Sequence, residues 1–187
     1  MTKQQTPHRF RGLEVDPRRD HIQGPANAPV TFMEYGDYQC PFCGEAYLIV
    51  KKIQREFGHN LRFVFRNFPL AQIHAYAEVA AEAAEAAGAQ NKFWEMHDYL
   101  YEHQAQLAPP QLIAAAERLG LDVERFTDDL SQHAYAERVR EDFLSGVRAG
   151  VNGTPTFFIN GVRHDGSWDF GTLSEAINAQ LEKRIAA

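Results

Sequence analysis

The sequence has 187 residues, of which 44% are hydrophobic and 24% charged, an ordinary composition for a globular protein with one sizeable core. Its net charge of −6 gives no overall basic footprint for nucleic acid, and no apolar run of about 18 residues is present that could span a membrane. The first twenty residues lack the apolar segment of a signal peptide, so we expect a cytoplasmic protein.

The amino-terminal third of the chain predicts an arm followed by a strand–helix–strand unit. Residues 1–20 are polar, charged and interrupted by proline, which predicts an extended arm. A short strand is expected at 21–23 and a buried apolar strand at 30–35. A helical pattern then runs from 41 to 57 and stops at Gly58. Alternating residues at 61–68 predict a second strand, parallel to the first because a helix connects them.

The middle of the chain shows only helical patterns, over 73–87, 92–103, 109–119, 122–130 and 134–149. Gly88, Gly120 and Gly150 follow three of these segments as stops. Glu78, Glu82 and Glu85 recur at helical spacing and predict a solvated helix face. Residues 71–150 are therefore expected to form a helical subdomain inserted between 21–70 and 151–187, because no linker composition flanks them.

The last part of the chain returns to strands. A short apolar strand at 156–159 precedes Asn160-Gly161, a pair that favours a two-residue hairpin turn, and 162–164 is the expected antiparallel partner. An amphipathic helix over 170–185 completes the order. The sequence β-α-β, helical block, β-β-α is that of an α/β thioredoxin fold with an inserted helical subdomain.

The only two cysteines lie in the motif Cys40-Pro41-Phe42-Cys43, directly after the first buried strand and at the start of a helix. This placement predicts a thioredoxin-type redox site. Cys40 would face unpaired N–H groups and the positive end of the helix dipole, which stabilise a thiolate. We expect Cys40 to be exposed enough to attack a partner and Cys43, one turn deeper, to be the more buried resolving thiol. A zinc site is not expected, because no second cysteine pair or H-x3-H spacing supplies four ligands.

Three segments carry a resemblance to a known family: EYGDYQCPFC at 34–43, FRNFPL at 65–70 and GVNGTPTFFING at 150–161. With them the chain resembles the DsbA-like thiol–disulfide oxidoreductases of the thioredoxin superfamily, and most closely the bacterial branch without signal peptides. The resemblance implies that Pro155 is cis and faces the dithiol, and that the backbone of Thr154 pairs with an extended substrate segment beside Pro41 and Phe42. It also matches Glu34 to the family's buried acid, while Asp37 and Tyr38 are expected to be surface residues without a catalytic role.

Phe42 departs from the strongly oxidising periplasmic members of this family, which carry a histidine at its position. Phenylalanine offers neither charge nor hydrogen-bond donor, so the reduced form should be less stabilised here. We expect a reduction potential between about −270 mV for thioredoxin and about −120 mV for DsbA, nearer the reducing end.

The predicted function is therefore exchange with protein disulfides and thiols, with Cys40 as nucleophile, Cys43 as resolving thiol and Glu34 handling the proton. No bound cofactor is expected, because electrons would pass to or from another dithiol system. Two alternatives stay open. One is a glutathione-dependent isomerase or transferase, although such relatives usually lack the resolving cysteine. The other is a redox-sensing binding or chaperone module that uses the helical block as a groove. The histidines, among them His74 and His97, are expected to be solvated or hydrogen-bonded.

Overall fold

The computed structural model describes residues 13–185, and these form a mixed sheet of five strands in the order β1-β3-β2-β4-β5. The central strands β2 (Val30–Gly36) and β3 (Leu61–Asn67) are parallel. The other pairings are antiparallel, and they involve β1 (His21–Gln23), β4 (Thr156–Ile159) and β5 (Val162–Arg163). Asn160 and Gly161 have φ values of 51° and 78°, the conformation of the tight hairpin turn that this pair predicts.

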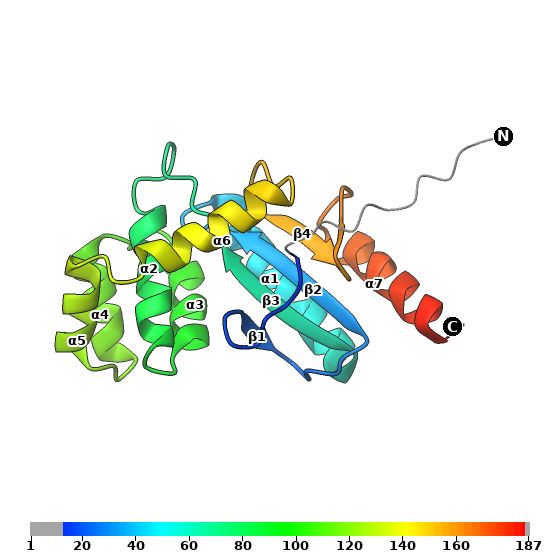
Figure 1. Ribbon diagram of the computed structural model, residues 1–187, viewed down its shortest axis with the longest axis horizontal. Helices are drawn as coiled ribbons and strands as arrows, with labels where there is room; N and C mark the ends of the chain where they lie inside the picture. The colour runs from blue at the N-terminus through cyan, green and yellow to red at the C-terminus, as the bar shows by residue number, and fades with distance from the viewer. Residues whose placement is uncertain (1–12, 186–187) are drawn as a thin grey trace.

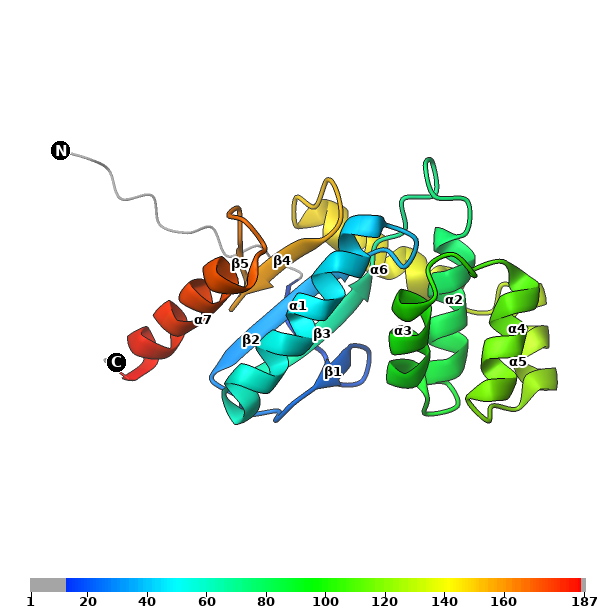
Figure 2. The same ribbon diagram turned by 180° about the vertical axis from the view of Figure 1, so that it is seen from behind.

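Helices cover both faces of the sheet (Figures 1 and 2). α1 (Pro41–Phe57), which is followed by the 3₁₀ turn η1 (Gly58–Asn60), packs with α7 (Phe170–Ile185) on the face that carries Phe32. On the other face α6 (Ala136–Arg148) crosses the sheet, and Phe143 packs against Phe68 at a ring distance of 4.4 Å. Two apolar clusters therefore lie on opposite sides of β2, because successive side chains of a strand alternate between faces.

The remaining helices form a block beside the sheet: α2 (Ala77–Gly88), α3 (Phe93–Glu102), α4 (Pro109–Arg118) and α5 (Val123–Ser131) (Figure 1). The apolar cluster beneath α1 continues into this block through Phe65, Phe93 and Leu100. The expected thioredoxin fold with a helical insertion is confirmed. Because the core is continuous, the insertion packs as part of the same hydrophobic core as the sheet.

The glutamates of α2 correct one expectation from the sequence. Glu78 is exposed, but Glu82 and Glu85 are buried, so the prediction of a solvated row was wrong for these two. Glu85 accepts hydrogen bonds from Asn67 Nδ2 at 2.8 Å and His21 Nε2 at 2.9 Å. The physical reason is that neighbouring helices and the sheet edge surround α2 and supply partners for both carboxylates.

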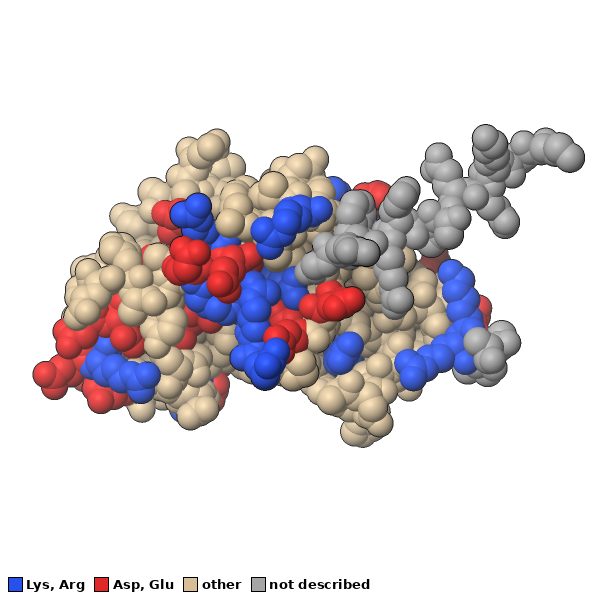
Figure 3. Space-filling model, in the orientation of Figure 1, with Lys and Arg blue, Asp and Glu red and all other residues tan. Residues whose placement is uncertain are grey.

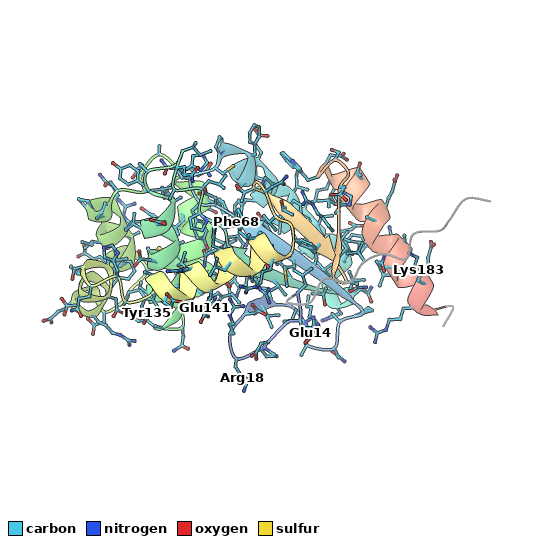
Figure 4. All side chains as sticks on the ribbon, turned by 45° about the horizontal axis from the view of Figure 1, so that its top comes forward. Glu14, Arg18, Phe68, Tyr135, Glu141 and Lys183 are labelled. Carbon is cyan, nitrogen blue, oxygen red and sulfur yellow. The ribbon has the colours of Figure 1, made fainter. Side chains whose placement is uncertain are left out.

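The segment before β1 is also better packed than the expected arm. Residues 1–12 of that arm lie outside the described residues. Leu13 is buried in the cluster beneath α6, and Asp20 forms a bidentate ion pair with the buried Arg66 at 2.8 and 2.9 Å. Figure 4 shows this segment, with Glu14 and Arg18, running past the sheet near α6. Residues 13–20 are therefore part of the folded core.

Charged side chains of both signs meet over α6 and the segment before β1, across the middle of the face drawn in Figure 3. Arg19 and Arg138 each donate to the buried Asp142 at 2.6 Å, and Asp142 also accepts from the backbone N–H of Asn67 at 3.1 Å. Mixed ion pairs thus join the amino-terminal segment, β3 and α6.

Candidate active site

The dithiol lies at the junction between β2 and α1. Cys40 is the N-cap residue of α1, with φ −70° and ψ 121°, and Pro41 occupies the first helical turn, where a missing N–H is harmless. The backbone N–H groups of Cys43 and Gly44 donate to the Cys40 carbonyl at 3.1 and 3.2 Å. The helix begins at the predicted residue, which places Cys43 one turn inside it.

The two thiols have opposite electrostatic surroundings. A hydrogen bond from the Cys43 thiol, together with the contact with Thr154 and the N–H groups of Cys43 and Phe42, lowers the pKa of Cys40 to about 5 despite its burial. Burial in the apolar core raises the pKa of Cys43 well above its usual value, although the N–H of Asp37 donates to its sulfur at 3.5 Å. At neutral pH Cys40 is therefore a thiolate and Cys43 a neutral thiol.

Cys40 is less accessible than expected. It is only 3% exposed, against 0% for Cys43, so the two thiols differ little in burial. Pro41 and Phe42 beside it are exposed, Phe42 by 59%. A partner can therefore approach the Cys40 sulfur over the exposed Pro41-Phe42 turn.

The loop before β4 lies across from the dithiol. The Thr154–Pro155 peptide bond is cis, and the carbonyl of Thr154 lies 3.4 Å from the Cys40 sulfur. The structure thus brings together Cys40 and Thr154, which are 114 positions apart in the chain.

Glu34 is buried beneath the dithiol, on the face of β2 that packs against α1. It is 1% exposed, and its neighbours across the sheet are Phe65 and Phe157. Burial, together with the nearby charge of Cys40, raises the pKa of Glu34 to about 8. Its Oε1 atom has no hydrogen-bond partner among the residues that the structure describes. Such a carboxyl can take up or release a proton near neutral pH.

The sequence prediction was wrong for Asp37 and Tyr38, both of which are buried at 1% exposure. Asp37 accepts from His74 Nδ1 at 2.7 Å and from the N–H of Leu70 at 2.9 Å, so it ties the loop before the dithiol to the loop after β3. The expected helix from residue 73 begins only at Ala77, because His74 and Leu70 are held in this contact. Tyr38 is hydrogen-bonded to the buried His97 at 3.0 Å.

Gln104, between α3 and α4, also holds the turn that carries the dithiol, and sequence analysis did not predict this contact. Its Nε2 donates to the carbonyls of Tyr38 at 2.9 Å and Cys40 at 2.8 Å. A Cβ atom added at Gly44 would collide with the Gln104 amide oxygen, so a larger residue there would displace this amide from its present position. No local pattern distinguishes Gln104 from an ordinary loop glutamine, because its partners lie more than sixty positions away.

Within residues 13–185, no group of three or more histidine, cysteine, aspartate or glutamate side chains could hold a metal ion. No helix in the same range is long and apolar enough to cross a membrane.

Comparison with known proteins agrees with this geometry. The family model described as Thioredoxin matches residues 17–179. This chain belongs to the thioredoxin family. Within it, the resemblance to the DsbA-like thiol–disulfide oxidoreductases is confirmed. The structure of BdbD from Bacillus subtilis shares 26% identity at a TM-score of 0.81, covering 89% of this chain and 95% of that one. A variant of α-DsbA1 from Wolbachia pipientis has the same fold, with 20% identity and a TM-score of 0.81 over 94% and 96% of the two chains.

A curated relative of this thioredoxin-family chain carries a different kind of name. The protein named Na(+)/H(+) antiporter NhaA 1 in Salinispora arenicola is 51% identical over 167 residues, which cover 89% of this chain and 26% of that protein. The chain thus spans about a quarter of the length of the curated relatives that it matches.

Proposed function

We propose that this protein catalyses dithiol–disulfide exchange with protein substrates through Cys40 and Cys43. The observation that carries the proposal is the contrast between the two thiols: one at a helix start with its pKa lowered to about 5, the other buried and neutral at its side. Exchange needs this asymmetry, because a thiolate must attack the partner before a second thiol resolves the product.

In the first step the Cys40 thiolate attacks one sulfur of a substrate disulfide. A mixed disulfide forms between Cys40 and that sulfur, and the other substrate sulfur leaves as a thiolate, which takes a proton from solvent. Thr154 and Pro155 hold the substrate backbone beside the sulfur by strand addition, while the exposed Pro41 and Phe42 contact its side chains.

In the second step Cys43 passes its proton to Glu34, attacks the Cys40 sulfur and releases the second substrate thiolate. The substrate disulfide thereby gains two electrons and becomes two thiols. Cys40 and Cys43 lose these two electrons as their disulfide forms. The pKa of Glu34 changes between the two steps in the direction that this proton transfer needs. The charge of Cys40 helps to raise the pKa of Glu34, and that charge is absent in the mixed disulfide. The carboxyl is then more often ionised when Cys43 needs a base.

Replacing Glu34 with glutamine should slow the resolving step by about 10²-fold at neutral pH, the lower range for loss of a general base. In the unmodified protein the rate of the resolving step should rise with pH as Glu34 ionises. The midpoint of this rise should be no higher than about 8, which is the pKa of Glu34 when Cys40 is charged. The variant should lose this rise and speed up only where Cys43 itself ionises. Stopped-flow measurement of mixed-disulfide decay against pH gives the answer, with Glu45→Gln on the exposed face of α1 as control.

Phe42 favours a dithiol that is less oxidising than DsbA. Phe42→His should raise the reduction potential by about 30–60 mV, because a hydrogen bond to a charged group is worth about 1.5–3 kcal/mol and 30 mV corresponds to about 1.4 kcal/mol. Phe42→Leu, which adds no donor, should leave the potential unchanged. Redox titration against glutathione measures both. A potential for the unmodified protein at the DsbA end of the range would refute the expectation.

We further propose a cytosolic location, net reduction of substrate disulfides and a separate dithiol protein as electron donor. A weakly oxidising dithiol is suited to the reducing poise of the cytosol. Cell fractionation combined with alkylation of the two thiols tests this, and a protein recovered outside the cytosol with its dithiol oxidised would contradict it.

One observation favours a binding role as a second candidate. A groove of about 930 Å³ lies between the loop after β3, α2 and α6. It is lined largely by apolar residues, and Ile73 and Val147 on it are exposed by 73% and 50%. Suppression of aggregation by a protein lacking both thiols would favour this candidate over exchange alone.

A further inference from the structure

Tyr101, on α3 of the helical block, lies over the strand that carries Glu34. A Cβ atom added at Gly36 would be 2.7 Å from the Tyr101 hydroxyl oxygen. Gly36 is two residues after Glu34 on β2, so the two positions point to the same face of the sheet. The hydroxyl of Tyr101 and the carboxyl of Glu34 therefore occupy the same buried space beneath α1, where Tyr101 also interacts electrostatically with Cys43.

Both groups have an unsatisfied polar atom. Tyr101 is 6% exposed, and neither its hydroxyl nor Glu34 Oε1 has a hydrogen-bond partner among the described residues. The other two tyrosines of the same aromatic cluster are satisfied: Tyr38 by His97 at 3.0 Å and Tyr47 by Glu102 at 3.2 Å. A buried orphan donor beside a buried orphan acceptor is costly, and a shared water molecule is the usual solution.

We propose that Tyr101 is a positioning residue for Glu34 and that the two bind one buried water between them. In this arrangement the tyrosine hydroxyl donates to the water, and the water donates to Glu34 Oε1. The carboxyl is thereby held toward Cys43, the thiol whose proton it receives in the proposed exchange reaction, on which this inference rests.

The chemistry of the tyrosine suits a permanent donor. Burial, with the nearby Cys43 and Glu34, raises the pKa of Tyr101 well above its usual value, so its proton stays in place at every working pH. The titratable groups that face Glu34 are Cys40 and Cys43 from α1, Tyr38 from the preceding loop and Tyr101 from α3. The strands on either side present only Phe65 and Phe157. Tyr101 is the neutral donor in this set that has no other partner among the described residues.

The test is the titration of the Glu34 carboxyl in full-length reduced protein, followed by carbon NMR with labelled glutamate and assigned by its loss in Glu34→Gln. The hydroxyl of Tyr101 is the donor that stabilises the Glu34 carboxylate in this arrangement. Tyr101→Phe removes that hydroxyl and keeps the ring. We expect its Glu34 pKa to move upward by about one unit, a tenfold change in proton affinity. Tyr47→Phe removes a hydroxyl from the same cluster and should leave the titration unchanged. An unshifted titration in Tyr101→Phe, or equal shifts in both variants, would overturn the proposal.

A high-resolution crystal structure of the unmodified protein provides a second measurement that needs no variant. We expect a water within hydrogen-bond distance of Tyr101 Oη and Glu34 Oε1, and side chains turned to separate partners would overturn the inference. The outcomes also separate this inference from the proposed function. If Glu34→Gln leaves exchange rates intact, the proton role of Glu34 fails even where Tyr101→Phe shifts its pKa. If Glu34→Gln slows exchange but Tyr101→Phe shifts nothing, the role of Tyr101 alone fails.

Discussion

Replacing Cys40 with serine should reduce the rate of insulin disulfide reduction to that of the uncatalysed reaction. The serine hydroxyl is not ionised at neutral pH, so the variant has no nucleophile at the start of α1, and Cys43 is a neutral, fully buried thiol that cannot take over. Turbidity of reduced insulin in the presence of a dithiol reductant measures the loss directly.

Replacing Cys43 with serine should have a different outcome, which makes it the matched control. Cys40 can still attack, but no second thiol releases the partner, so mixed disulfides should accumulate and be visible on non-reducing gels. Applied in cells, the same variant would capture the natural partners. Catalytic reduction of insulin by Cys40→Ser, or failure of Cys43→Ser to form mixed disulfides, would end the assignment of roles to the two cysteines.

Asp20→Ala should lower the free energy of unfolding by about 3–5 kcal/mol, the usual cost of removing one partner from a buried ion pair. Asp20 and Arg66 are both fully buried, and their two hydrogen bonds join the segment before β1 to the middle of the sheet. Without the carboxylate, the buried guanidinium of Arg66 loses its ion-pair partner Asp20, and its hydrogen bonds to the neutral Tyr35, Ser145 and Glu14 carbonyl do not replace that negative charge. Urea denaturation of the two proteins measures the difference.

Asp16→Ala is the matched control for this experiment. Asp16 lies four residues earlier in the same segment and pairs with Arg18, whose side chain is 89% exposed and points away from the protein in Figure 4. Exposed pairs of this kind contribute little, so the variant should unfold at the same urea concentration as the unmodified protein. Equal effects of the two substitutions would show that residues 13–20 do not stabilise the fold through the buried pair.

The helical block contributes to the redox site as well as to the core. Gln104 donates hydrogen bonds to the carbonyls of Tyr38 and Cys40 in the turn before α1, and His97 on α3 is hydrogen-bonded to the Tyr38 hydroxyl. Asp37 and His74 connect the same turn to the loop that lines the groove beside α6. Asp37 also donates its backbone N–H to the Cys43 sulfur at 3.5 Å, so a short chain of hydrogen bonds connects that loop to the dithiol.

Much of this architecture was predictable from local sequence. The apolar strand, the two cysteines three positions apart and the glycine after Phe57 define β2, the dithiol and the end of α1 without any long-range information. Asn160-Gly161 likewise predicted its hairpin. The failures at polar residues concern their surroundings: Glu82 and Glu85 looked like a solvated helix face, and Asp37 and Tyr38 like surface residues, because periodicity does not reveal what packs against a polar side chain.

By itself the sequence determined the order of elements and the place of the Cys40–Cys43 dithiol at a helix start, since these follow from spacing along a few residues, whereas Glu34 was indicated only by the resemblance to a family. Only the tertiary structure decided that Cys40 is almost covered, that Asp37 is held by His74, and that Gln104 and Tyr101 reach the site from the helical block. These contacts join residues tens of positions apart, and their energies depend on burial and distance, which no local pattern of residues encodes.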